Sequence, residues 1–381
     1  MGYQLCAGLR PYTFVIRPLI VAETQIITCG TGAAEARESA ASRGRTDGGP
    51  VIDIHCHLGV PAASRHVPAE YHFALPANPS LSDTVNASMM RAIAPQLNGI
   101  DVRLTDMDRL GIDMQVMSPN PGQYFYAAPL ECTRAAATEI NDALAEAVSR
   151  EPSRLMALGT VPMQDPAEAA AEMRRCSKEL GFRGIEIGTN VAGRDYDDPA
   201  FAPFFQAAEE LGMLLFMHPM GFTEPKRLGK YHLANVIGNP LDTTIAVSHL
   251  VFGGVLDRHP GLKVCVAHGG GFIGAYAGRW EHAYHHREDC QTCISRPPSA
   301  YLRQLYFDTL VFDRKQLAAL LDKWGPERLC LGSDYPFDMA EPDPVGFHDA
   351  LSDAPRNAIL GGNAQRLLGL DAVHSGAGES A

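Results

Sequence analysis

The sequence predicts a (β/α)8 barrel, in which parallel strands alternate with helices around one closed core. Apolar runs of strand length recur along the chain, and most are nearly continuous, as expected for parallel strands that helices cover. An open, doubly wound sheet is the alternative, but no G-x-G-x-x-G motif follows the first run to support it. The predicted strands span residues 51–57, 114–118, 155–162, 182–188, 213–219, 262–268, 305–310 and 329–335.

The first predicted strand ends in a His-X-His motif, within the run V-I-D-I-H-C-H-L over residues 51–58. Because side chains two residues apart point to the same side of a strand, His55 and His57 are expected on one face. Two imidazoles placed in this way can hold a metal ion. Taken alone, the motif is also explained by two incidental histidines on a surface strand, so its meaning depends on partners elsewhere in the chain.

The segments between the strands carry helix signals. A capping aspartate followed by proline begins one helix at Asp165, which is expected to end at Gly181. Asp198 begins a second helix in the same way, and Gly212 closes it. Longer connections follow the first, fifth and sixth strands, over residues 59–109, 220–260 and 269–301. Because the loops after barrel strands build the active site, we expect a lidded pocket there and no second domain.

The two ends of the chain differ in composition from the barrel. Residues 30–49 are rich in glycine, alanine, serine and charged residues, which cannot bury enough apolar surface to order a segment. We therefore predict a flexible leader over residues 1–49, a barrel over 50–372 and a disordered tail over 373–381.

The overall composition excludes several classes of protein. A hydrophobic content of 46% and a charged content of 20% are typical of a globular protein with a large core. A formal net charge of −12 argues against nucleic acid or an anionic membrane as the main partner. No run reaches the roughly 20 apolar residues of a membrane span. Nine irregularly spaced cysteines do not form a disulfide framework, so we expect a reducing, cytoplasmic compartment.

Three further predicted strands also end in a polar residue. His218 ends the fifth strand, His268 the sixth and Asp334 the eighth. In a barrel these positions meet at one mouth, together with His55 and His57. Their nitrogen and oxygen atoms suit Zn2+ or a similar divalent ion such as Mn2+. The sequence therefore predicts a metal site with a nearby acid or base.

The strand-end histidines and several longer motifs resemble the amidohydrolase superfamily, in the branch of α-amino-β-carboxymuconate-ε-semialdehyde decarboxylase and related metal-dependent decarboxylases. The resemblance covers roughly residues 51–370. Its markers are D-I-H-C-H (53–57), D-M-D-R-L-G-I-D-M-Q-V (106–116), H-P (218–219), A-H-G-G-G-F-I-G-A-Y-A-G-R (267–279), R-P-P-S-A-Y (296–301) and L-G-S-D-Y-P-F (331–337).

The resemblance implies a role for each of these site residues. The metal ligands would be His55, His57, His218 and Asp334. Next to them, His268 would be the catalytic acid and base, and Asp334 would also contribute to catalysis. Arg279 would reach the site of a neighbouring subunit in a homodimer and bind the substrate carboxylate there. Arg91 matches a second carboxylate-binding arginine. A solvated charge on a helix explains Arg91 equally well. No lysine ends the fourth strand, whose last residues, 184–188, offer only Glu186, so we expect a single metal ion.

The reaction stays open at this point. A divalent ion lowers the pKa of bound water from about 15.7 toward 7 and polarises a substrate oxygen. A histidine beside it can take and return a proton near neutral pH. These groups could decarboxylate an unsaturated or aromatic carboxylate. Alternatively, they could act as a hydrolase or hydratase on an amide, a lactone or an oxo-dicarboxylate. The resemblance favours decarboxylation, with 2-amino-3-carboxymuconate 6-semialdehyde as the first candidate substrate.

Overall fold

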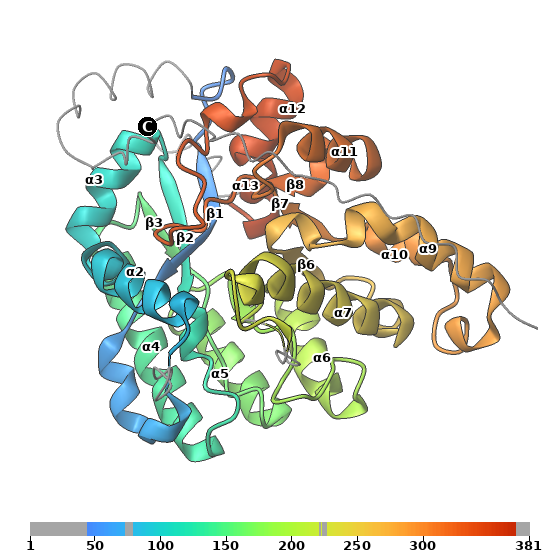
Figure 1. Cartoon of the computed structure of the whole chain (residues 1–381), viewed down its shortest axis with the longest axis horizontal. Helices are drawn as coiled ribbons and strands as arrows, with labels where there is room; N and C mark the ends of the chain where they lie inside the picture. The colour runs from blue at the N-terminus through green and yellow to red at the C-terminus, as the bar shows by residue number, and fades with distance from the viewer. Residues whose placement is uncertain (1–43, 73–78, 221, 223–226, 371–381) are drawn as a thin grey trace, which may run out of the picture.

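The chain folds into a closed barrel of parallel strands surrounded by helices (Figure 1). A computed structural model describes residues 44–72, 79–220, 222 and 227–370. Three strands pair in the order β1-β2-β3 and five in the order β4-β5-β6-β7-β8, with every pair parallel. The strands are β1 Ile52–Leu58, β2 Met114–Pro119, β3 Leu155–Ala157, β4 Gly184–Ile187, β5 Leu214–Met217, β6 Lys263–Val266, β7 Tyr306–Asp308 and β8 Leu329–Cys330.

Two parallel bridges join the two sheets into one barrel. Gly159, which follows β3, pairs with Ile185 of β4. On the other side, Cys56 of β1 pairs with Tyr335, which follows β8. The (β/α)8 prediction is therefore confirmed, and the open-sheet alternative does not fit.

The strands β3 to β8 end earlier than the sequence predicts, whereas β1 and β2 each end one residue later. Their expected number and order are found, but β5 stops at Met217 and β6 at Val266, so His218 and His268 lie just beyond the regular ladder. Asp334 lies four residues after the end of β8. The apolar pattern continues past each strand because these segments stay buried after they leave the ladder.

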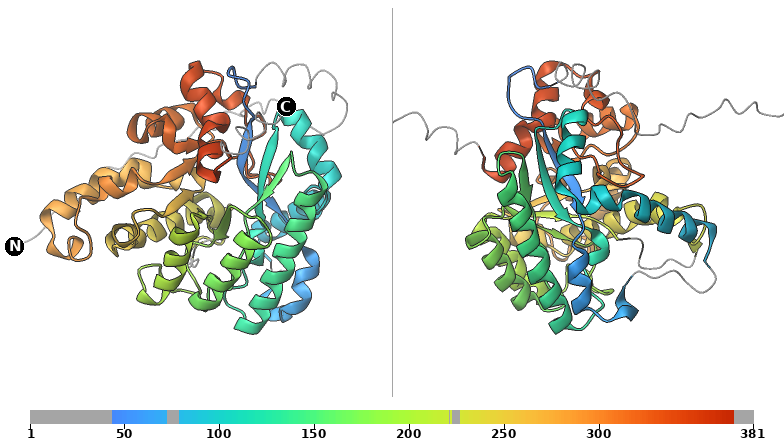
Figure 2. Two further views of the ribbon diagram at one scale, coloured as in Figure 1. Left: turned by 180° about the vertical axis from the view of Figure 1, so that it is seen from behind. Right: turned by 90° about the vertical axis from the view of Figure 1, so that its left-hand side faces the viewer.

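Helices cover the outside of the strands, and Figure 2 shows those between residues 130 and 211 side by side. Asp165 caps α5 by accepting from the backbone N–H groups of Ala167 and Glu168. Asp198 caps a short 3-10 turn that leads into α6, which ends at Gly212 with φ 63°. The helices are α2 Leu81–Asn98, α3 Ile100–Leu110, α4 Leu130–Arg150, α5 Pro166–Lys178, α6 Ala202–Leu211, α7 Asn239–Phe252, α8 Val255–Arg258, α9 Ile273–His286, α10 Pro298–Leu302, α11 Arg314–Trp324, α12 Asp353–Asn357 and α13 Asn363–Leu368.

The predicted long connections hold additional helices. The segment between β1 and β2 contains α2 and α3, and that after β6 contains α9 and α10. In Figure 1, α9 projects away from the barrel. Within the described ranges, no helix combines the length and apolar character that a membrane crossing requires.

The predicted leader and tail fall largely outside the described residues, which begin at 44 and end at 370. Residues 44–49, which the prediction assigns to the leader, make side-chain hydrogen bonds to the last helices. The Arg45 guanidinium donates to Gln365 Oε1 at 2.6 Å, and Arg356 of α12 donates to the Gly44 carbonyl at 2.7 Å. This short segment is therefore attached to the barrel.

Candidate metal centre

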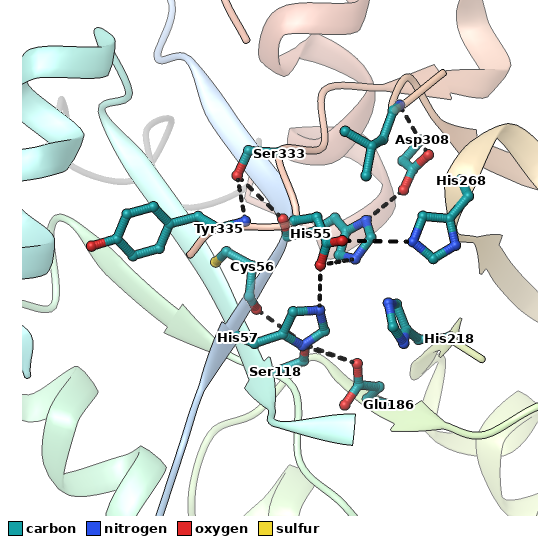
Figure 3. Close-up of polar contacts among 12 residues, drawn as sticks. His55, Cys56, His57, Ser118, Glu186, His218, His268, Asp308, Ser333 and Tyr335 are labelled. Atoms are coloured by element: carbon teal, nitrogen blue, oxygen red, sulfur yellow. Dashed lines mark hydrogen bonds and ion pairs between the residues drawn. The ribbon is translucent and has the colours of Figure 1, made fainter. Parts of the chain in front are cut away.

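The four residues predicted as metal ligands come together at the carboxyl ends of the strands. One ligand atom from each of His55, His57, His218 and Asp334 lies within 4.8 Å of the others, and all four side chains are buried. Figure 3 shows the imidazoles of His55, His57 and His218 turned toward one another. The barrel thus gathers three separate parts of the chain into one buried site for a divalent ion.

The atoms that face this site lack ordinary hydrogen-bond partners. Among the described residues, neither ring nitrogen of His218 has a partner, and the same holds for Nε2 of His55 and of His57 and for Oδ1 of Asp334. This oxygen lies 3.4 Å from Nε2 of His55 and 3.2 Å from Nε2 of His57. Buried polar atoms are costly when unpaired. Zinc or manganese would be satisfied by one nitrogen from each histidine together with the carboxylate oxygen, and would give each of these four atoms a partner.

The charge balance of the site also suits a cation. Burial holds the pKa of His218 well below its usual range, so this imidazole is neutral and can donate a lone pair. Burial opposes ionisation of Asp334, but the charge of His55 and contacts with three histidines hold the pKa of this carboxyl well below its usual range. Burial also opposes protonation of His55, yet Asp334 and Asp308 raise its pKa to about 10. Carboxylates thus attract positive charge to this point, which a bound divalent ion supplies.

Asp308 at the end of β7 orients one of the ligands. Its Oδ2 accepts from Nδ1 of His55 at 2.6 Å, which leaves Nε2 of that ring free for a metal. Its Oδ1 accepts from the backbone N–H of Gly269 at 2.8 Å, next to His268. Sequence reasoning missed Asp308, because the predicted strand runs on to residue 310 and places Asp308 inside it, whereas β7 ends at Asp308. The available signal was an acidic residue within a mostly apolar run.

Ser118 and Glu186 surround the other β1 ligand. Nδ1 of His57 lies 3.1 Å from the Pro119 carbonyl and 3.1 Å from the Ser118 hydroxyl. The Ser118 hydroxyl lies 3.0 Å from Glu186 Oε1. Burial raises the pKa of Glu186 well above its usual range, which keeps this carboxyl neutral. Glu186 therefore packs behind His57 and does not form part of the four-residue cluster.

His268 lies beside the cluster at the start of a glycine loop. Its ring centroid is 4.9 Å from that of His218, and its Nε2 is 3.8 Å from Oδ2 of Asp334. The side chain is 16% exposed, whereas those of His55 and His57 are fully buried. The loop needs its glycines: Gly271 has φ 62°, and a Cβ there would lie 2.3 Å from the Pro240 carbonyl oxygen. This bend lets His268 reach both the cluster and solvent.

A cavity of about 530 Å3 opens beside the cluster and reaches His218 and Asp334. Its wall combines apolar and amide side chains, most of them from the inserted segments, by which we mean the long connections after β1 and β5, and the others from the segments after β2 and β8. In the connections after β1 and β5, His72, Met220, His232 and Asn235 line the cavity, whereas Tyr231 does not. The principal lining residues are Val60, His72, Asn86, Met89, Met90, Asn98, Asn120, Phe125, Met220, His232, Asn235, Asn239, Phe337 and Met339.

The two predicted substrate-binding arginines do not line this cavity. Arg91 is an exposed residue of α2 and is not among the α2 residues that line it. Arg279 is an exposed residue of α9, the helix that projects from the barrel (Figure 1). Their roles in substrate binding therefore stay predictions, and for Arg279 the prediction requires a second copy of the chain.

Comparison with known proteins gives one family and several relatives. A sequence profile described as "Amidohydrolase" matches residues 52–370. The 2-amino-3-carboxymuconate-6-semialdehyde decarboxylase of Dictyostelium discoideum is 38% identical over 275 residues, which cover 71% of this chain and 77% of that relative.

Two solved structures share the fold. The 5-carboxyvanillate decarboxylase LigW from Sphingomonas paucimobilis is 25% identical with a TM-score of 0.75, and the match covers 84% of this chain and 98% of that one. The 5-carboxyvanillate decarboxylase from Novosphingobium aromaticivorans DSM 12444 is 23% identical with a TM-score of 0.75, covering 85% of this chain and 97% of that one. The second structure contains manganese and 4-hydroxy-3-methoxy-5-nitrobenzoic acid.

Proposed function

The chain belongs to the amidohydrolase family, and we propose that it is a single-metal, non-oxidative decarboxylase of an unsaturated or aromatic carboxylate. The similarity to the Dictyostelium decarboxylase supports decarboxylation over hydrolysis or hydration, because the site chemistry alone serves all of them. The observation that carries the metal-dependent part of the proposal is the buried cluster of three histidines and one aspartate with His268 next to it.

His55, His57, His218 and Asp334 would hold the ion. When bound, a divalent ion polarises substrate oxygens and lowers the pKa of bound water. The hydrogen bond from His55 to Asp308 fixes which ring nitrogen faces the site. The buried walls of the cluster exclude bulk water, which strengthens electrostatic interactions with the substrate.

His268 would carry the proton. In the proposed step, its imidazolium gives a proton to the carbon that bears the leaving carboxylate, and the substrate π electrons form the new C–H bond. The bond from this carbon to the carboxylate then breaks, its electron pair returns to the π system, and CO2 leaves. The Oδ2 atom of Asp334, 3.8 Å from Nε2 of His268, would help to orient the imidazole.

We take 2-amino-3-carboxymuconate 6-semialdehyde as the first candidate substrate because of the 38% identical relative. The cavity of about 530 Å3 is large enough for a single small ring or an open-chain acid of this size. For the metal we propose zinc first, and the manganese in the Novosphingobium structure supports manganese as the second candidate. The seven described cysteines are free thiols, which fits the cytoplasmic placement that we propose.

The deciding experiment measures CO2 release by the purified protein with its metal content determined. The substrate panel contains the semialdehyde, made in situ, and carboxylated phenols. Amides, lactones and oxo-dicarboxylates form the matched hydrolase and hydratase panel. Release of CO2 with about one metal ion per chain supports the proposal. Turnover of the second panel alone would replace it with the hydrolase or hydratase alternative.

The proposed homodimer is tested by mixing two inactive variants. Arg279→Ala would lack the arginine supplied to a neighbour, and His218→Ala would lack a metal ligand. A mixed dimer would contain one complete site if Arg279 crosses the interface, so activity should return. A verified mixed dimer without activity would contradict the shared site.

A further inference from the structure

A chain of buried polar side chains runs behind the metal cluster and is not part of it. Arg103 of α3, Gln115 of β2, Asp53 of β1 and Ser333 after β8 are each no more than 1% exposed. The guanidinium of Arg103 donates to Gln115 Oε1 at 2.8 Å, and Gln115 Nε2 donates to Asp53 Oδ2 at 3.1 Å. The Ser333 hydroxyl donates to the same carboxylate at 2.6 Å. These four residues form one continuous hydrogen-bonded network, which we call the support network.

Both ends of the support network hold the backbone beside metal ligands. Arg103 donates to the carbonyl of His57. Asp53 Oδ1 accepts from the N–H of His55 at 3.1 Å and from the N–H of Ser333 at 3.0 Å, one residue before Asp334. The support network therefore hydrogen-bonds to the backbone at or next to three of the four proposed ligands, His55, His57 and Asp334.

The network lies where the strand ladder becomes irregular. Asp53 pairs with Gln115 and Cys56 pairs with Met117, so β1 advances three residues while β2 advances two. The additional residue of such a bulge loses its regular ladder partners. The Asp53 carboxylate takes over the N–H of His55 at this point, and the His55 carbonyl accepts from the N–H of Asp334 at 2.8 Å. The Asp53 carboxylate thus supports the backbone of His55 at the bulge.

Gln115 connects two charged side chains, Arg103 and Asp53, that are both buried. Among the described residues, no carboxylate lies within ion-pair distance of the Arg103 guanidinium, which packs instead over the ring of Tyr335 at 5.0 Å. A buried charge is costly unless it is compensated. The Gln115 amide accepts from the cation and donates to the anion, so it links Arg103 and Asp53 through opposite ends of one neutral group.

We propose that Arg103, Gln115, Asp53 and Ser333 are positioning residues that set the metal affinity of the site by fixing His55, His57 and Asp334 relative to one another. The inference rests on the proposed ligand set, but it is independent of the reaction that the site performs. Loss of such outer contacts typically weakens metal binding about 10- to 100-fold.

The test compares two glutamines. Gln115→Met removes the link while keeping the size of the side chain and both charged residues. Gln164→Met is the matched control, because the Gln164 amide makes three hydrogen bonds, to Phe125, Ala128 and Thr133, away from the ligands. The Kd for Zn2+ and Mn2+ is measured by competition with a chromogenic chelator, after circular dichroism has verified the fold of each metal-free variant. Gln115→Met should raise the Kd about 10- to 100-fold, and Gln164→Met should leave it unchanged.

The outcomes separate this inference from the proposed reaction. An unchanged Kd in Gln115→Met, or an equal rise in Gln164→Met, would overturn the positioning role. If Gln115→Met does not fold, Ser333→Ala is measured in its place, because it removes one hydrogen bond to Asp53. A rise in Kd that is smaller than the one expected for Gln115→Met supports the positioning role. An unchanged Kd overturns it. An unaltered protein that binds metal but releases no CO2 would overturn only the decarboxylase proposal. One that binds no metal would overturn both.

Discussion

The strand ends hold the metal-binding residues, whereas inserted segments hold most of the cavity wall beside them. His55 and His57 are fully buried and lie on a strand that pairs on both sides. Met220 and His232 line the cavity from the connection after β5, and Met220 is 53% exposed. The metal-binding residues are thus buried, whereas part of the wall is exposed to solvent. Substitutions of the residues at the metal site should remove the metal or the catalytic activity. Substitutions in the cavity wall should change only substrate binding.

The largest effect is expected from removing a ligand. His218→Ala should lower metal affinity by more than about 100-fold and reduce turnover to background, because it deletes one of four donors. Metal analysis after dialysis measures the loss. His348→Ala is the control, since His348 is also a buried histidine but hydrogen-bonds to Pro344 and Thr309. It should destabilise the fold and keep the metal; equal metal loss in both variants would refute the ligand role.

Replacing His268, the proposed proton donor, should lower catalytic activity without removing the metal. His268→Ala should retain the metal and lower kcat about 10²- to 10⁴-fold, because general acid-base catalysis supplies a factor of this size. Metal analysis and steady-state rates on one preparation measure both quantities. Metal loss equal to that of His218→Ala would make His268 a ligand and contradict its proposed role.

A smaller effect is expected behind the ligands. Asp308→Asn keeps the shape of the side chain but removes the charge that Nδ1 of His55 faces at 2.6 Å. Metal affinity or activity should fall about 10- to 100-fold, as is typical for such outer contacts. Metal titration with the chelator assay measures the change. Unaltered affinity and activity would show that His55 needs no orienting carboxylate.

The smallest effect is expected in the cavity wall. Asn235→Ala should raise KM about 3- to 10-fold, the worth of one hydrogen bond, and leave the metal content unchanged. Val236→Ala is the matched control, because Val236 is the next residue, is 49% exposed and does not line the cavity. Steady-state kinetics with the best substrate of the panel measure KM. A loss of metal in Asn235→Ala would break the division between the two regions.

The strand order and the four proposed ligands could be expected from sequence because both have local signals. A buried parallel strand needs a continuous apolar run, and a polar residue at its end stands out against that run. Asp308 was missed because the predicted strand continues to residue 310, so this carboxylate did not lie at its end, and its partner His55 is far away in sequence. The residues at which β5 and β6 end could not be predicted from the sequence, because a buried loop and a buried strand have similar composition.

The sequence alone determined the barrel, the residues that meet at its mouth and the donor types suited to a divalent ion. Periodicity and composition are local properties of the chain, so they can be read without a structure. Only the tertiary structure decided that Asp308 orients His55, that Arg103 and Gln115 connect to Asp53, and which inserted residues line the cavity. These depend on contacts between segments far apart in sequence, which form only when the barrel closes and brings β1 beside both β2 and the segment after β8.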